Sequence, residues 1–426
     1  MEKIRAIRGM NDVLPRESYK WEWIETRIKS WVSSFGYRNI RTPVVESTNL
    51  FVRSIGAATD IVEKEMYTFT DSLNGDSLTL RPEGTASVVR SALEHNLTYG
   101  NPSRLYYFGP MFRHERPQKG RFRQFNQVGV EALGFEGPDI DAEHVMMTAK
   151  LWEQLDISSD SLQLEINTLG SEKERVRYRQ ALVEFLKKNW NDLDEDSQRR
   201  VDANPLRVLD SKNAGTQELL TLAPKLMDHL SDSTLAKFDR FKAMLKNIGI
   251  DFTVNSSLVR GLDYYNDVVY EWKTEFLGAQ GTVCAGGRYD GLSEQIGGKK
   301  IHSCGFALGV ERLLSLLENN AIEIPEVTPD IYVVHIGEQA EAYALNTSVT
   351  LRDKGFRVLL HCGGGSLKAQ MKKADASAAR FAVIIGDREV ERRTVSLKPL
   401  RDGEAATQDQ QELNIEDCLE ILLKGN

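Results

Sequence analysis

The feature that most constrains this chain is a basic turn between two strand-like runs at residues 106–131. The segment reads YYFGPMFRHERPQKGRFRQFNQVGVE, and PQKG separates the two runs. Because a strand sends alternate side chains to one face, a hairpin here would gather its odd-numbered residues on one surface. That surface would carry guanidinium groups, a ring, an amide and carboxylates. Such a set of groups suits the binding of a polyphosphate, a flat base and a small polar ligand. The odd-numbered residues are Arg113, Glu115, Arg121, Arg123, Phe125, Gln127, Gly129 and Glu131.

A hairpin with one charged face is more often a plain solvated surface. Two observations favour a ligand here. The even-numbered face is only partly apolar, and the five Lys and Arg between Arg113 and Arg123 stand in a chain whose net charge is -8. Local basicity against an acidic background indicates a specific anion site.

Length and composition predict a soluble protein of two or three domains. The chain has 426 residues, 41% of them hydrophobic and 27% charged. No apolar run approaches the ~18 residues that span a membrane, and the amino terminus lacks the apolar stretch of a secretory signal. The four cysteines form no CxxC pair, and the seven histidines show no metal-ligand spacing. We expect a cytoplasmic protein with no membrane contact and no structural metal.

Residue periodicity predicts mixed strands and helices before residue 325, interrupted by a helical insertion. Between about 171 and 248 the chain is rich in Lys, Arg, Asp, Glu and Leu, which indicates amphipathic helices. The other expected elements are helices over 17–35, 84–95 and 139–155, strands over 37–45, 77–81, 162–168, 252–259, 264–273 and 280–288, and a strand or turn that feeds a helix over 305–318.

The remainder of the chain alternates between strand and helix patterns after a linker marked by Pro325 and Pro329. This alternation predicts a small α/β domain of the doubly wound kind. The glycines at 363–365 are better explained as a flexible turn than as a phosphate cradle, because no GxGxxG or Walker pattern surrounds them. The expected strands cover 331–337, 356–361, 381–386 and 393–398, and the expected helices cover 338–354, 366–378 and 413–424.

Two short segments place polar residues beside glycines. In LRPEGT, residues 80–85, Glu83 and Thr85 could hold an ammonium group while Gly84 allows close backbone approach. Helix capping by Glu83 or Thr85 is the simpler explanation. In CAGGRYDG, residues 284–291, the paired glycines would let the backbone close over a ligand, and a tight turn explains them equally well.

Two further segments place an arginine near a glycine. LVRGLDYYNDVVYEW, residues 258–272, crowds Arg260, Tyr264 and Tyr265 at a strand start, where each face would receive one tyrosine ring. An arginine in such a place often reaches an anion. In GFALGVERL, residues 305–313, Arg312 could lie over a ring or beside a phosphate, and a solvated arginine is the plainer alternative.

The order of these segments resembles one enzyme family. GYRNIRTP (36–43), FRHE with RFRQF (112–125) and GFALGVER (305–312) resemble motifs 1, 2 and 3 of class II aminoacyl-tRNA synthetases. RGLDYY (260–265) and AGGRYD (285–290) are similar to two signature segments of the histidyl-tRNA synthetase family. The resemblance covers nearly the whole chain. It implies an α+β catalytic core with an antiparallel sheet, a helical insertion and a C-terminal α/β anticodon-binding domain.

The resemblance also implies boundaries and an activity. The catalytic core would span 1–170 and 251–325, the insertion 171–250 and the anticodon-binding domain 330–426. The activity would be formation of histidyl-adenylate from L-histidine and ATP, with Mg²⁺ accompanying ATP, and transfer of histidine to the 3′ end of its tRNA. The alternative is a non-catalytic paralogue, a regulatory subunit of ATP phosphoribosyltransferase. Such paralogues tend to lack the anticodon-binding domain and ATP-binding residues, and both are present here.

The site residues that the resemblance implies form two groups. No protein nucleophile is needed, so catalysis would rest on positioning and charge stabilisation. Two catalytic arginines, Arg113 and Arg260, would bind the α-phosphate. The rest of the ATP group would be Arg121 near the γ-phosphate, Glu115 at the adenine amino group, and Phe125 and Arg312 on the two sides of adenine. The histidine group would be Glu83, Gly84, Thr85, Gln127, Glu131, Arg260, Tyr264 and Tyr265.

Partners follow from the same resemblance. Motif 1 forms a dimer interface in the family, so a homodimer is expected. Packing within the chain would explain the apolar stripe of the 17–35 helix equally well. The insertion would lie near the tRNA acceptor stem, and Arg123 with the turn at Gln118–Gly120 would face the tRNA. Four basic side chains would meet tRNA phosphates or form a solvated helix face: Lys368, Lys372, Lys373 and Arg380.

Overall fold

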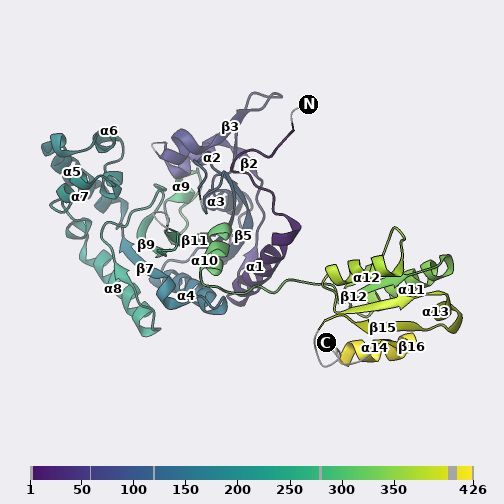
Figure 1. Cartoon of the computed structure of the whole chain (residues 1–426). Coiled ribbons are helices and arrows are strands. Elements are labelled where there is room, and N and C mark those ends of the chain that lie inside the picture. Colours follow the sequence, from purple (N-terminus) through teal and green to yellow (C-terminus); the bar gives the residue numbers. More distant parts are fainter. Residues whose placement is uncertain (1–2, 58, 119, 278–280, 402–409, 425–426) are drawn as a thin grey trace. The chain divides into compact units, whose positions relative to one another are not determined.

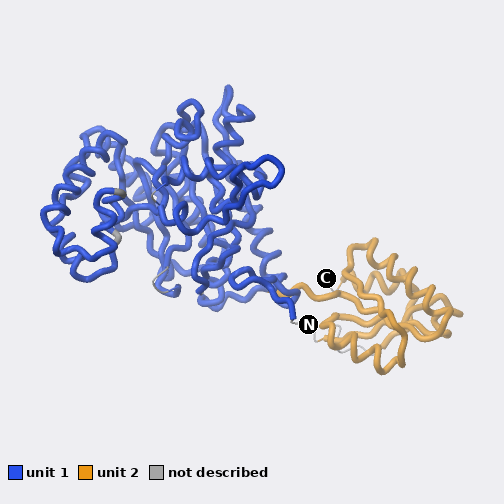
Figure 2. The backbone as a smooth tube through the Cα atoms, turned by 90° about the horizontal axis from the view of Figure 1, so that it is seen from above, with its two compact units in different colours: residues 1–324 blue, residues 325–426 orange. Residues whose placement is uncertain are grey.

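The computed structural model describes residues 3–424 except 58, 119, 278–280 and 402–409 (Figure 1). The chain forms two compact units, residues 1–324 and 325–426 (Figure 2). Within the described ranges, no helix combines the length and apolar character needed to cross a membrane.

The first unit is built on a sheet with the strand order β1-β5-β6-β11-β10-β9-β7-β8. Its inner pairs are antiparallel, and the two edge pairs, β1 with β5 and β7 with β8, are parallel. This confirms the predicted antiparallel core sheet. The strands are β1 (Arg38–Asn39), β5 (Ser103–Phe112), β6 (Gln124–Leu133), β11 (Ser303–Gly309), β10 (Thr282–Arg288), β9 (Asn266–Lys273), β7 (Gln163–Thr168) and β8 (Thr253–Val254).

An apolar layer of helices covers one face of this sheet. Val128 and Val130, even-numbered residues of β6, are fully buried in that layer together with Trp31. The odd-numbered residues of β6 therefore face the other side. Burial of Trp31 also means that packing within the chain accounts for the apolar stripe of the first helix. The covering helices are α1 (Pro15–Ser34), α4 (Pro138–Gln154), α8 (Asp232–Asn247) and α10 (Val310–Asn319).

The opposite face is bordered by a small antiparallel sheet and short helices. The small sheet has the order β2-β4-β3. The turn into α3 carries two of the predicted site residues, Glu83 just before the helix and Thr85 at its first position, to the large sheet. The bounds are β2 (Val45–Ser47), β4 (Ser77–Leu80), β3 (Tyr67–Thr70), α2 (Thr48–Ile55), a π-helical turn (Ile61–Glu65), α3 (Thr85–Glu94) and α9 (Leu292–Gln295).

The segment between β7 and β8 is helical, as the composition predicted. Figure 1 shows α5, α6 and α7 grouped at one side of the first unit. The last helix, α8, instead packs on α4, and its Phe238, Phe241 and Leu245 belong to the central core. The remaining bounds are α5 (Glu172–Lys188), α6 (Glu195–Ala203), α7 (Ala214–Leu220) and 3₁₀ turns at Ser159–Ser161, Trp190–Asp192, Pro205–Asp210 and Leu226–His229.

The second unit is a five-stranded sheet with helices on both faces, in the order β13-β12-β14-β15-β16. The first three strands are parallel, and β15 and β16 continue the sheet antiparallel. Two elements were not predicted, α13 (Asp387–Arg392) and β16 (Gln411–Leu413). The others are β12 (Ile331–His335), α11 (Glu338–Asp353), β13 (Val358–Leu360), α12 (Leu367–Ala376), β14 (Phe381–Ile385), β15 (Val395–Pro399) and α14 (Ile415–Lys424).

Two predicted strands were wrong in extent. The 37–45 strand is two pieces, since β1 pairs with β5 while β2 pairs with β4 in the other sheet. Pro43 lies between them and cannot donate a ladder hydrogen bond. The 252–259 strand is reduced to Thr253–Val254. Residue 280, the start of another predicted strand, lies outside the described residues.

Candidate active site

A pocket of about 290 Å³ opens on the face of the large sheet that carries the odd-numbered residues of β6. It brings together chain segments that are far apart in the sequence. Gly84 and Glu131 are the two predicted residues that do not line it. The predicted residues that do are Glu83, Thr85, Arg113, Glu115, Arg121, Phe125, Gln127, Arg260, Tyr264, Tyr265 and Arg312.

One end of the pocket is strongly basic. The Nη1 of Arg312 donates to the carbonyl of Thr282 at 2.6 Å. Burial, together with the nearby charges of Arg121 and Arg113, lowers the pKa of Arg312 to about 10. Three guanidinium groups that repel one another in a partly buried site strongly favour the binding of an anion.

The aromatic ring at this end is Phe125. The Arg113 guanidinium lies 5.3 Å from the centre of that ring, and its Nε donates to the carbonyl of Pro82 at 2.9 Å. Arg121 forms an ion pair with Glu115, which is 8% exposed. A charged cluster beside a ring offers a nucleotide both a phosphate partner and a stacking surface.

The alternation that predicted this cluster holds for only part of the segment. The strands end at Phe112 and resume at Gln124, so Arg113–Arg123 form their connection. Arg123 does not join the cluster, because its backbone N–H donates to Gly9 and its Nε donates to the carbonyl of Glu115. It ties the amino-terminal segment to the connection. Lys119, in the predicted basic turn, lies outside the described residues.

At the other end of the pocket, the lining residue Thr85 contacts a fully buried carboxyl group, that of Glu131, which does not itself line the cavity. Thr85 donates its hydroxyl hydrogen to one oxygen at 2.7 Å, and Tyr289 donates to the other. Burial raises the pKa of Glu131 to about 8, although these two hydrogen bonds oppose the rise. A buried carboxyl group whose pKa lies near neutral pH is a candidate for a functional site.

Glu83 has the capping role that was the simpler explanation. Its two oxygens accept from the backbone N–H groups of Thr85 and Ala86 at 2.7 and 2.9 Å, at the start of α3. Burial raises the pKa of Glu83, and these two backbone hydrogen bonds oppose the rise. An ammonium-binding role for Glu83 stays a prediction.

The glycines on this face make room for a tyrosine. A Cβ atom on Gly84 would lie 2.3 Å from the ring of Tyr107, and one on Gly129 would lie 2.1 Å from it. The Tyr107 hydroxyl donates to Oε1 of Gln127 at 2.9 Å. The close approach predicted at Gly84 is therefore to a side chain of the same chain, which orients a pocket residue.

Tyr264 and Tyr265 do not occupy opposite faces of a strand, because β9 begins after them at Asn266. Their ring centres lie 4.7 Å apart, and the ring of Tyr289 lies 5.5 Å from that of Tyr264. All three rings are buried. They form one aromatic wall beside Glu131.

The loop that carries Arg260 and these tyrosines is held by the helical insertion. Nη2 of Arg207 donates to the carbonyl of Gly261 at 2.6 Å, and its Nη1 lies 3.1 Å from Asp60. Arg175 donates to the carbonyl of Tyr265. The insertion thus fixes part of the pocket from outside it.

The tight-turn explanation of the paired glycines in 284–291 was wrong, whereas close approach to a ligand stays a prediction. Gly286 and Gly287 lie inside β10, and a Cβ atom on Gly286 would stand 2.5 Å from the carbonyl oxygen of Gly305. They permit close strand packing. The next residue, Arg288, is fully buried and binds Asp141 of α4 at 2.6 Å, so it joins the sheet to a helix.

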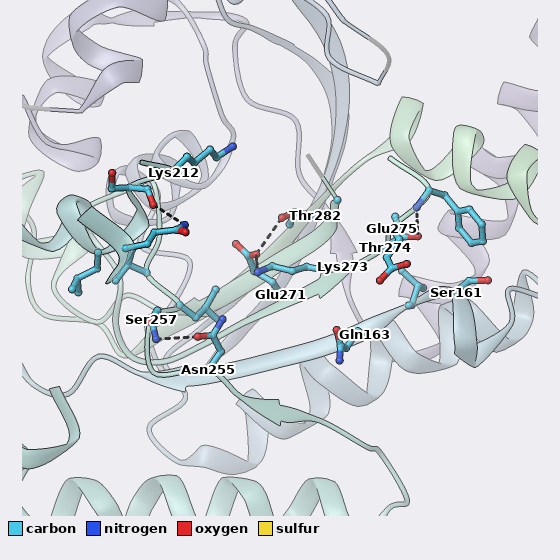
Figure 3. Close-up of a pocket in the computed structure, with 18 of the residues that line it drawn as sticks. Ser161, Gln163, Lys212, Asn255, Ser257, Glu271, Lys273, Thr274, Glu275 and Thr282 are labelled. Carbon is cyan, nitrogen blue, oxygen red and sulfur yellow. Dashed lines mark hydrogen bonds and ion pairs between the residues drawn. The ribbon is translucent and has the colours of Figure 1, made fainter. Parts of the chain in front are cut away.

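A larger pocket of about 1220 Å³ adjoins the first. Figure 3 shows Glu271, Lys273 and Thr282 projecting into it from neighbouring strands. Glu271 and Thr282 also line the first pocket, so the two share a wall.

Sequence reasoning missed four residues at this site: Tyr107, Glu271, Thr282 and Tyr289. Glu271 had a signal, since it is a carboxylate within the otherwise apolar strand VVYEW. Tyr289 stands in the AGGRYD segment, and Tyr107 is paired with Gly129 across the hairpin. Thr282 had no signal in the sequence.

Comparison with known proteins agrees with this geometry. A family model described as Histidyl-tRNA synthetase matches residues 9–313. A curated Histidine--tRNA ligase of Nitrosomonas europaea is 60% identical over 94% of this chain and 95% of its own length. The chain belongs to the histidyl-tRNA synthetase family.

The family likeness extends over both units. A model described as Anticodon binding domain matches residues 330–425. The Histidine--tRNA ligase of Thiobacillus denitrificans is 56% identical over 100% of both chains. The crystal structure of apo S. aureus histidyl-tRNA synthetase has a TM-score of 0.82 and 36% identity, and the match covers 99% of this chain and 100% of that one. The class II synthetase fold is thus shown for the chain.

Proposed function

We propose that this chain activates L-histidine with ATP and transfers it to the 3′ end of its tRNA. The observation that carries the proposal is the division of one sheet face into a basic, aromatic end and a buried carboxyl end. ATP occupies the end with Arg113, Arg121, Phe125 and Arg312. Histidine occupies the end with Glu131.

At the ATP end, Arg113 and Arg260 bind the α-phosphate and Arg121 lies near the γ-phosphate. Glu115 contacts the adenine amino group, and adenine lies between Phe125 and Arg312. The mutual repulsion of the arginines supports these roles, since binding of the polyphosphate relieves it.

At the other end, the histidine ring meets Glu131 and the aromatic wall of Tyr264 and Tyr265. Gln127, oriented by Tyr107, and the Glu83, Gly84 and Thr85 turn bind the polar groups of the amino acid. A pocket that pairs hydrogen-bonding groups with its substrate rejects analogues lacking them by roughly 10⁴-fold or more, so no editing domain is required.

The first chemical step is an attack by the histidine carboxylate oxygen on the α-phosphorus. The new P–O bond forms as the bond to pyrophosphate breaks, and the arginines stabilise the developing negative charge. Mg²⁺ arrives as the counter-ion of the substrate ATP. The pocket carboxylates already have protein partners, for Glu83 caps α3, Glu115 pairs with Arg121, and Glu311 accepts from Asn126. In the second step a ribose hydroxyl of tRNA attacks the adenylate and AMP leaves.

The proposal also assigns a role to each part of the chain. Residues 1–170 and 251–325 form the catalytic core, 171–250 the insertion near the acceptor stem, and 330–426 the anticodon-binding domain. The exposed lysines Lys368, Lys372 and Lys373 of α12 meet tRNA phosphates, with Arg380 beside them. The chain works as a homodimer in the cytoplasm.

The regulatory-subunit alternative is not favoured by the observations. It requires neither an ATP site nor an anticodon-binding domain, and this chain has a residue set for the first and a matching second unit.

Histidine-dependent exchange of pyrophosphate into ATP tests the first step. The purified chain should catalyse exchange with histidine. Absence of exchange under conditions where ATP binds would overturn the proposal. A chain ending near residue 325 should keep most of this exchange and charge tRNA more weakly, and undiminished charging would contradict the role given to the second unit.

A further inference from the structure

Glu271 is a buried carboxylate in the wall that separates the two pockets. It lies on β9, is 8% exposed, and lines both cavities. Figure 3 shows its side chain beside Thr282 and Lys273. Burial of a charged side chain is costly unless it is paired, so its partners indicate what it does.

Its first partner is Arg260, whose Nη1 contacts Oε1 of Glu271. The Arg260 side chain is 15% exposed, and its Nε is buried without a hydrogen-bond partner. The guanidinium is therefore held at Nη1 by Glu271, while the Arg260 side chain lines the first pocket. A guanidinium that is fixed at the wall of a pocket suits an incoming phosphate oxygen.

Its second partner links it to another arginine of the pocket. The hydroxyl of Thr282 donates to Oε2 of Glu271 at 3.1 Å. The carbonyl of the same Thr282 accepts from Nη1 of Arg312 at 2.6 Å. One carboxylate thus contacts Arg260 directly and reaches Arg312 through a single residue.

The nearby lysine does not compete strongly for this carboxylate. Nζ of Lys273 lies 3.5 Å from Oε2 of Glu271 but 2.7 Å from Oε2 of Glu165 on β7. Glu165 also accepts from Asn255 at 2.8 Å. Lys273 is bound mainly by Glu165, which leaves Glu271 to Arg260 and Thr282.

We propose that Glu271 is a positioning residue for adenylate formation: it orients Arg260 toward the α-phosphate and, through Thr282, fixes Arg312. This inference rests on the proposed role of Arg260. A long arginine side chain loses much rotamer freedom when it is fixed, and an ion pair made before the substrate binds removes that cost from the reaction. Glu271 need not touch either substrate.

The test is Glu271→Gln in the full chain, which keeps the shape of the side chain and removes its charge. We expect kcat of histidine-dependent exchange to fall by about 10-fold to 100-fold, because a misplaced catalytic group slows a reaction by a factor of this size. KM for histidine should change by less than about twofold, because a loss confined to the transition state leaves ground-state binding intact.

Glu165→Gln is the matched control. It removes a carboxylate of the same type that binds the same Lys273 and does not contact Arg260, so exchange should stay at the wild-type rate. Equal losses in the two variants would mean that general destabilisation of the sheet, and not positioning, explains the effect.

A double-mutant cycle with Arg260→Ala decides whether Glu271 acts through Arg260. In the Arg260→Ala background, Glu271→Gln should lower kcat much less than it does in the wild type, because only its effect through Thr282 on Arg312 remains. The inference would be overturned if the double variant lost kcat by the full product of the two single losses. It would also be overturned if Glu271→Gln alone kept the wild-type kcat. A wild-type chain without histidine-dependent exchange would instead overturn the proposed function, and the inference with it.

Discussion

Replacing Glu131 by glutamine should make the stability of the first unit less dependent on pH. The carboxyl group is buried, and burial raises its pKa to about 8 from the 4.5 of an exposed glutamate. The folded chain therefore binds more protons than the unfolded chain between these two pKa values. Its free energy of unfolding falls as pH rises through that window and suffers no further loss above it.

The magnitude follows from the two pKa values. Proton linkage lowers the free energy of unfolding of the wild type by about 3 kcal/mol at pH 7. This loss approaches about 5 kcal/mol above pH 8. Glu131→Gln lacks this penalty, though it loses one accepted hydrogen bond worth about 1 kcal/mol at every pH. With an unfolding entropy of about 2 cal/mol/K per residue, each kcal/mol moves the melting temperature of this unit by about 1.5 °C.

The assay is thermal unfolding of the wild type and the variant from pH 5 to pH 9. The melting temperature of Glu131→Gln minus that of the wild type should rise by several degrees across the range and level off above pH 8. The same variant should raise KM for histidine. A difference in melting temperature that does not change with pH would refute the account of Glu131.

Glu165→Gln provides a control, because its effect on stability should depend on pH in the opposite direction. Burial of Glu165 tends to raise its pKa, but hydrogen bonds from Lys273 and Asn255 outweigh this and lower it. An acid with a lowered pKa stabilises the folded state above its unfolded pKa. Glu165→Gln should therefore be less stable than the wild type at neutral pH, and this deficit should shrink as pH falls.

Three further predictions concern the support of the pocket. Gly129→Ala should cost about 1–3 kcal/mol of stability by overpacking against Tyr107 and raise KM for histidine, and unchanged denaturation and kinetics would contradict the role of the glycine. Arg288→Met should cost about 3–5 kcal/mol because it leaves Asp141 buried and unpaired, whereas adding Asp141→Leu should recover much of the loss in chemical denaturation. Arg207→Met should raise KM for histidine without abolishing exchange, because the 260–265 loop loses one anchor. Arg199 of the same insertion, whose ion pair among the described residues is with Asp196, should tolerate the same change.

Most of the site was predictable because it follows strand alternation and motif order. Gln127, Gly129 and Glu131 share a face of β6, as a period of two requires. The position of Arg113 could not follow from that period, because the strand ends at Phe112. The long connection depends on contacts with the amino-terminal segment at Gly9, which no local pattern records.

The unpredicted features depend on partners distant in the sequence. Tyr289 meets Glu131 only because β10 and β6 both pair with β11. For Gly286 and Gly287 the sequence left a tight turn and a ligand-closing backbone equally open, whereas close contact with β11 and β9 requires glycine at both positions. The single strand predicted over 37–45 is divided between two sheets, and only the tertiary arrangement decides that.

The central claim is that one sheet face joins histidine to ATP and then to tRNA. Its most direct test is the initial rate at which the full chain charges purified total tRNA with each of the twenty amino acids in the presence of ATP and Mg²⁺. The account predicts charging with histidine at a rate at least about 10⁴-fold above that for any other amino acid. Charging with a different amino acid, or none with histidine while ATP binds, would contradict it.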